Sequence, residues 1–130
     1  MVTAIQKILQ AVAKPHPAAD RLGTPLKDAF IEYFGASSIN ESNAIAIICM
    51  LYLSHRLKGF PIDKLRLAVY NIQEICPLPK FNCNHYTDIM AAIPKAALRN
   101  VPLYNSECEI EYVTLAEKDI LEAFDFYTNR

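Results

Sequence analysis

Residues 44–53 read AIAIICMLYL, a stretch of ten residues without a single charge. A helix that is apolar on every side has to be surrounded by other elements. Ten residues of helix rise about 15 Å, half the hydrocarbon core of a bilayer. The stretch is therefore predicted to be the buried centre of a folded domain and not a membrane span. Ser38 and Glu41 have capping-box spacing, so this helix is expected to begin there and to run to about Leu57.

Five further helices are expected around this centre, each from apolar residues at helical spacing. The first occupies residues 1–14 and ends at a proline. The others are expected near residues 24–35, 61–76, 85–93 and 114–127, separated by proline, glycine or polar residues. The predicted fold class is all-α: a compact bundle of about six helices around a central apolar helix, forming a single domain of residues 1–130.

Residues 107–113 alternate polar and apolar side chains, as a strand does. A lone strand does not suit a helical bundle, so this segment is expected to lie extended over the helices, after a connection at residues 102–106. Glu107, Glu109 and Glu111 would then project from one side as an acidic strip. The strip is interpreted either as a solvated edge or as a docking strip for a basic partner.

The composition excludes several classes of protein. Of the 130 residues, 52% are hydrophobic and 21% are charged, which is typical of a globular chain and not of a disordered one. The net charge of −1 supplies no positive field, so no nucleic-acid partner is expected. The three glycines are not clustered as a phosphate-binding loop requires, so no nucleotide cofactor is expected.

The four cysteines are Cys49, Cys76, Cys83 and Cys108, and they form no Cys-x-x-Cys pair. Free thiols, together with an N-terminus that lacks the pattern of a secretory leader, indicate an intracellular protein, cytoplasmic or nuclear. Three of these cysteines, with His85, are conceivable zinc ligands. Their spacing matches no standard zinc pattern, so no metal is expected.

The sequence shows no catalytic motif around its histidines, His16, His55 and His85. Cys83 and His85 are two positions apart, and on a helix they would not face each other. The protein is therefore expected to be non-enzymatic. An enzyme that uses the Cys83–His85 pair is the least favoured hypothesis.

Some apolar side chains lie off the buried stripes of their helices. They are Leu67 and Tyr70 in the fourth helix and Phe126 in the last. An exposed groove at these residues would be a protein-binding surface.

The order of the helices resembles that of a cyclin box. Three segments carry the resemblance: LKDAFIEYF at 26–34, the end of the central helix, LYLSHRL, at 51–57, and EKDILEAFDF at 117–126. The resemblance implies one cyclin box at residues 25–130, preceded by the helix at 1–14. A cyclin has no active site; it binds a cyclin-dependent protein kinase and favours the active arrangement of that kinase.

The resemblance also implies partner-binding residues. Glu117 matches the glutamate of the family's fifth helix, whose carboxylate would accept hydrogen bonds from the kinase. Thr114 and Glu117 also have capping-box spacing, which by itself explains a glutamate here. Lys80 is the nearest match to the family's lysine, and the family's docking patch maps to Leu26, Ala29, Phe30 and Tyr33. The alternative function is that of a small helical adaptor, or an immunity-type inhibitor, that binds another protein.

Overall fold

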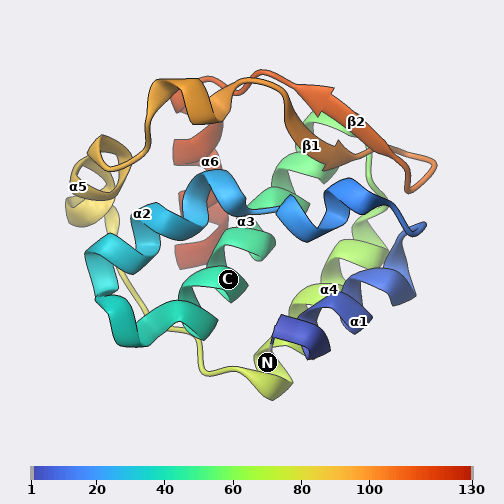
Figure 1. The fold of residues 1–130 in the computed structure, drawn as a ribbon, viewed down its shortest axis with the longest axis horizontal. Helices are drawn as coiled ribbons and strands as arrows, with labels where there is room; N and C mark the ends of the chain where they lie inside the picture. Colours follow the sequence, from blue (N-terminus) through green and yellow to red (C-terminus); the bar gives the residue numbers. More distant parts are fainter. Residues whose placement is uncertain (1, 130) are drawn as a thin grey trace.

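The computed structural model describes residues 2–129, with the side chains of all of these except residues 2, 3 and 20. In this part of the chain it contains six α-helices and one two-stranded antiparallel sheet (Figure 1). The helices are α1 (Val2–Val12), α2 (Thr24–Phe34), α3 (Ile39–Lys58), α4 (Ile62–Ile75), α5 (Tyr86–Ala91) and α6 (Glu117–Thr128). The strands are β1 (Val101–Tyr104) and β2 (Ile110–Val113), and short 3-10 turns lie at η1 (Pro17–Arg21), η2 (Ala36–Ser38), η3 (Cys83–His85) and η4 (Lys95–Leu98). The prediction of a mainly helical bundle is confirmed. The fold is not purely α-helical, because β1 and β2 form a small sheet.

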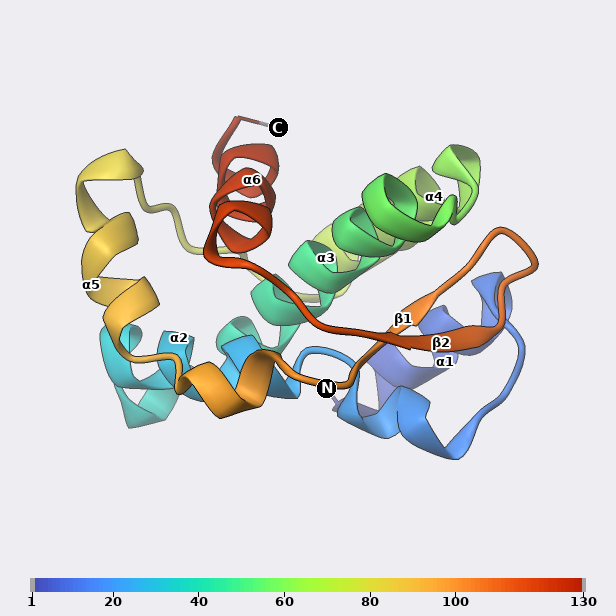
Figure 2. The same ribbon diagram turned by 90° about the horizontal axis from the view of Figure 1, so that it is seen from above.

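The helix α3 forms the centre of the molecule, as predicted (Figures 1 and 2). Residues 44–51 and Leu53 are buried, and Tyr52 is partly buried. The elements α1, α2, α4, α6 and β1 pack around α3, whereas α5 packs against α2 and α6. Within residues 2–129, no helix combines the length and the apolar character needed to cross a membrane.

An aromatic cluster joins α2 and α6 to the proline-rich loop after α4. Phe81, from that loop, has its ring centroid 5.7 Å from those of both Phe30 and Phe124. It also stacks on Tyr127 at 5.4 Å and meets Tyr86 edge to face at 5.9 Å. Such offset and edge contacts add to the stabilisation from ring burial. The loop is therefore fixed to the core through one buried ring.

The strands β1 and β2 form a hairpin, seen at the upper right of Figure 1, in which Tyr104 lies opposite Ile110. The prediction of a connection at residues 102–106 and an unpaired segment at 107–113 is therefore wrong. All four residues of β1 are buried because the strand packs against α3 and η1. A strand covered on both faces shows no polar–apolar alternation, so its pattern does not reveal it.

The helix ends differ from the predictions in their chemistry. The hydroxyl of Ser38 donates to the carbonyl of Gly35 at 2.6 Å instead of capping α3, so the predicted capping box at Ser38 is wrong. The helix α2 begins at Thr24, where it was expected, and its N-cap is Gly23, with a φ of 96°. The helix α3 ends at Lys58, close to the expected end at Leu57, and its C-cap is Gly59 in the left-handed conformation.

Candidate functional site

The docking patch implied by the cyclin resemblance consists mostly of core residues. Leu26, Ala29 and Phe30 are at most 1% exposed, and Tyr33 is partly buried. A docking patch needs side chains that a partner can reach, so Leu26, Ala29 and Phe30 do not form an exposed patch. Lys80 is exposed, in the loop that follows α4.

Glu117 is the first residue of α6, and its side chain is exposed. The predicted Thr114–Glu117 capping box is wrong, because the carboxylate of Asp119 accepts the hydrogen bond from the N–H of Ala116 at 2.9 Å. Glu117 instead lines an open groove of about 490 Å³ between α5 and α6, together with Leu121. Because Asp119 caps α6, the carboxylate of Glu117 is not used in the cap and lies at the surface, where a partner can reach it.

A hollow of about 320 Å³, here called the arginine cavity, lies between α2 and the segment that leads into β1. Its walls come from residues 21–29 and 92–102, which are far apart in the sequence. The apolar lining includes Ala29, Ala92, Val101 and Pro102, and the polar lining includes Arg21, Thr24, Asp28, Arg99 and Asn100. Its volume is at the lower end of the range of small-molecule sites. Neither of these two segments contains a sequence motif that would predict a binding site.

Two guanidinium groups give the arginine cavity its charge. Arg21 and Arg99 are both exposed, and neither forms an ion pair with any carboxylate among the described side chains. Asp28 lines the same cavity. Asn100, at its rim, has a φ of 52°, which asparagine adopts more readily than most residues. Because guanidinium groups bind carboxylates through paired hydrogen bonds, the cavity suits a small anion.

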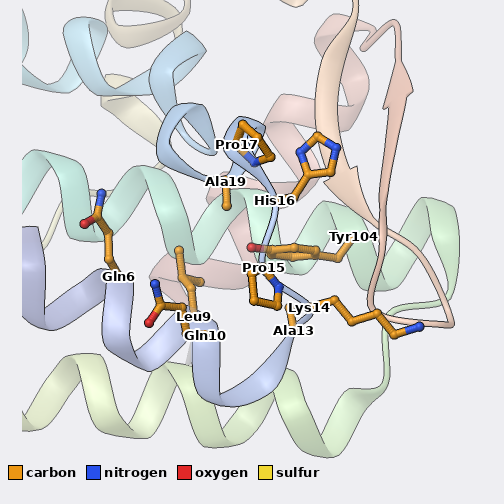
Figure 3. Close-up of a pocket in the computed structure, with 10 residues that line it drawn as sticks. All are labelled: Gln6, Leu9, Gln10, Ala13, Lys14, Pro15, His16, Pro17, Ala19 and Tyr104. Carbon is orange, nitrogen blue, oxygen red and sulfur yellow. The ribbon is translucent and has the colours of Figure 1, made fainter.

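A third hollow, of about 280 Å³, lies between α1 and η1 (Figure 3). The Nδ1 of His16 accepts a hydrogen bond from the N–H of Ala18 at 2.9 Å, so the neutral ring carries its hydrogen on Nε2. Lys14 extends toward the hairpin and pairs with Glu109 at 3.5 Å. The cationic group of this hollow, Lys14, therefore already has a carboxylate partner, whereas Arg21 and Arg99 have none among the described side chains.

The α4–α6 groove, of about 360 Å³, is lined by Arg66, Val69, Tyr70, Gln73 and Phe126. The prediction of exposed apolar side chains in this region is confirmed, since Tyr70 is 59% and Leu67 49% exposed. The ring of Phe126 is partly buried and stacks on that of Tyr52 with the centroids 4.6 Å apart.

Thiol and imidazole groups do not assemble into a site in the described residues. No group of three or more His, Cys, Asp or Glu side chains there could hold a metal ion, so Cys76, Cys83, Cys108 and His85 are not gathered as zinc ligands. All the cysteines are free, and only Cys83 is exposed. Burial, with a smaller contribution from the charge of Glu41, raises the pKa of the Cys76 thiol.

The acidic strip is partly neutralised by nearby bases. Glu109 pairs with Lys14 at 3.5 Å, and Glu111 pairs with Lys58 at 3.4 Å. The side-chain amide of Asn105 also donates to Glu111 at 2.7 Å. This hydrogen bond, followed by the interaction with Lys58, lowers the pKa of Glu111. The strip therefore fits a solvated edge of the hairpin better than a docking strip for a basic partner.

Part of the chain is similar to a known enzyme. It is 32% identical over 90 residues to the 3-dehydroquinate synthase of Parabacteroides distasonis. The match covers 65% of this chain and 26% of that protein, so it spans about a quarter of the length of this relative. No family model and no solved structure matches the chain.

Proposed function

We propose that the chain is a non-enzymatic helical domain that binds a small carboxylate in the arginine cavity. The observation that carries the proposal is that Arg21 and Arg99 line one cavity and form no ion pair with a described carboxylate. Their N–H groups are donors only, so a ligand at this place has to supply acceptors. The similarity to part of a 3-dehydroquinate synthase supports the choice of ligand, because 3-dehydroquinate is itself a small carboxylate.

The lining of the cavity suggests how such a ligand is held. The carboxylate binds Arg21 and Arg99, and the apolar side chains of Pro25 and Pro94, which are accessible in this cavity, contact the body of the ligand. Hydrogen bonds between a guanidinium group and a carboxylate are charge-assisted and can form in pairs, which fixes the orientation of the ligand. Asp28, on the same wall as Ala29, accepts hydrogen bonds from hydroxyl groups of the ligand.

The proposal is tested by calorimetric titration of the protein with 3-dehydroquinate. Arg21→Ala and Arg99→Ala are each expected to weaken binding by about tenfold or more, because a hydrogen bond to a charged group contributes about 1.5–3 kcal/mol. Arg66→Ala removes another exposed arginine, outside the cavity, and is expected to leave binding unchanged. The proposal is rejected if the unmodified protein gives no binding, or if both cavity variants bind as well as it does.

A second candidate is the regulatory protein implied by the cyclin resemblance. The observation in its favour is Glu117, whose identity the cap does not explain because Asp119 supplies the capping carboxylate. Glu117 lies beside Leu121 and Met90 in the α5–α6 groove, so an acidic group and apolar side chains are presented together. In this proposal the partner is a cyclin-dependent protein kinase, and an adaptor or inhibitor would bind a different protein through the same groove.

The second candidate is tested by surface plasmon resonance with purified cyclin-dependent kinases. Glu117→Ala is expected to weaken binding, whereas Lys118→Ala, the next residue on α6, does not line the groove and leaves binding unchanged. Arg99→Ala is also without effect in this assay, which separates the two candidates. If no kinase binds the unmodified protein, the kinase-regulator proposal fails.

A further inference from the structure

The α4–α6 groove is distinct from the arginine cavity and from the α5–α6 groove. Residues of α4 and α6 line the α4–α6 groove together, and both helices pack against α3 (Figure 2). Arg66, Val69, Tyr70 and Gln73 follow one another at the spacing i, i+3, i+4 and i+7, so they form one stripe of α4. The groove therefore follows α4 for two turns, roughly 10 Å.

The two walls of the groove present aromatic rings. On α4, Tyr70 is 59% exposed, so most of its ring is in water. On α6, the ring of Phe126 is held against Tyr52 in a stacked arrangement with an interplanar angle of 20°. This wall is preformed, so a partner meets an ordered ring and loses little side-chain entropy there. Aromatic residues are among the residue types that contribute most of the binding energy at protein interfaces.

The charge of the groove is positive and has no described counterion. Arg66 is the one charged residue among those that line it, and none of the described carboxylates pairs with it. Glu122, one turn before Phe126 on α6, is engaged by Arg56 at 3.5 Å and so does not neutralise Arg66. A complementary partner therefore carries a carboxylate next to its apolar side chains.

We propose that the α4–α6 groove binds an amphipathic helix of a partner protein that presents an acidic side chain to Arg66. A helix laid between two helices places apolar residues at i, i+3 and i+4 against the groove, which is a recurring mode of peptide recognition. Its apolar side chains contact Tyr70 and Phe126, and its carboxylate pairs with the guanidinium of Arg66. This binding site is independent of carboxylate binding in the arginine cavity.

The probe is a designed amphipathic peptide of about 18 residues, long enough to form a helix. It carries leucines on one face and glutamates along the edges of that face, and a matched peptide has lysine at each glutamate position. Binding to the full chain is measured by fluorescence anisotropy at low and moderate salt. The peptide is mapped on the protein by amide chemical shifts, and the oligomeric state is measured by sedimentation.

The acidic peptide is expected to bind, to shift amides of α4 and α6, and to bind about tenfold or more tightly than the lysine peptide. Arg66→Glu and Tyr70→Ala are each expected to weaken it by about tenfold or more. Both side chains are exposed, so these variants keep their fold, which circular dichroism verifies. Lys7→Glu, the same change of charge on an exposed residue of α1, is the matched control and leaves binding unchanged.

Three results overturn the proposal. The first is equal binding of the acidic and lysine peptides, or equal binding by Arg66→Glu and the unmodified protein. The second is the absence of peptide binding, or chemical shifts confined to other elements. The third is a dimer in sedimentation that Tyr70→Asp dissociates, which would assign the groove to a second copy of the chain.

Discussion

The hydroxyl of Ser54 in α3 accepts a hydrogen bond from the backbone N–H of Tyr104 in β1, at 3.0 Å. The same hydroxyl donates to the carbonyl of Met50, one turn earlier in α3, at 2.8 Å. Ser54 is 0% and Tyr104 1% exposed, so no water replaces either bond. One buried hydroxyl therefore joins the hairpin to the central helix.

Ser54→Ala is expected to lower the free energy of unfolding by about 1–3 kcal/mol, because it removes the buried hydrogen bond that Ser54 accepts from the N–H of Tyr104. The measurement is urea-induced unfolding followed by circular dichroism. Ser42→Ala is the matched control, because Ser42 is also buried in α3 but its hydroxyl pairs with that of Ser38. In this variant the hydroxyl of Ser38 still donates its hydrogen bond to the carbonyl of Gly35. An equal decrease in the free energy of unfolding in the two variants would show that the hydrogen bond to Tyr104 does not add to stability.

Asp119→Ala is expected to lower the free energy of unfolding by about 1 kcal/mol, because it removes the acceptor for the N–H of Ala116 at the start of α6. Glu117→Ala removes a carboxylate two residues away and is expected to change it by less than about 0.5 kcal/mol. Thermal unfolding of both variants checks this difference. If Glu117→Ala lowers the free energy of unfolding more than Asp119→Ala does, Glu117 and not Asp119 caps α6.

Gly23→Ala is expected to be more destabilising than Gly59→Ala. Both glycines are in the left-handed region, with φ of 96° and 77°, so each alanine suffers the strain of that conformation, about 1 kcal/mol or more. A Cβ on Gly23 would in addition lie 3.2 Å from the backbone of Ala46 and Ile47, whereas a Cβ on Gly59 meets the side chain of Ser106 at an ordinary 3.5 Å. Unfolding free energies measured in urea are expected to separate the two variants by about 1 kcal/mol or more.

Glu111 is expected to titrate below the usual range of a glutamate, because the amide of Asn105 and the ammonium of Lys58 both favour its carboxylate and lower its pKa. A pKa that is lower in the folded state means that the associated stability is present above the unfolded pKa and is lost as the pH falls through the folded one. Side-chain NMR titration measures this pKa directly. Lys58→Met is expected to raise it only partly, since the larger cause, the hydrogen bond from Asn105, remains. An unchanged pKa in Lys58→Met would contradict the contribution of the ion pair.

Cys83 is expected to be the thiol that alkylates rapidly in the folded protein, because Cys49, Cys76 and Cys108 are buried. Mass spectrometry after brief treatment with iodoacetamide locates the label. In urea all these thiols are expected to react. Rapid labelling of Cys49 under native conditions would contradict its place in the core.

The burial of α3 can be read from the sequence because ten successive apolar residues leave a helix no polar face. The strand β1 cannot be read in this way. Its VPLY sequence shows no alternation, since both faces of the strand are covered, and Pro102 argues against a strand in general. The start of α6 was misplaced because Thr114–Glu117 and Ala116–Asp119 have the same spacing, and spacing alone does not choose between them.

The candidate sites also differ in whether the local sequence predicts them. The exposure of Leu67 and Tyr70 follows from their position off the buried stripe of one helix, so local periodicity predicts it. The arginine cavity was missed because Arg21, at the end of η1, and Arg99 line one cavity only when residues 21–29 pack beside residues 92–102. No local signal marks either residue, and only the tertiary arrangement shows that they share a cavity.

The cover that α6 provides for α3 has a consequence for synthesis on the ribosome. The thiol of Cys49, in the middle of α3, lies against the carbonyl of Ala123 in α6 at 3.9 Å, and both residues are fully buried. A nascent chain emerges with its N-terminal part first, at about 5–20 residues per second. Residues 44–53 thus wait for a few seconds or more until the helix that covers them has been made. During that interval this apolar stretch lacks the cover of α6 and can be bound by chaperones or aggregate.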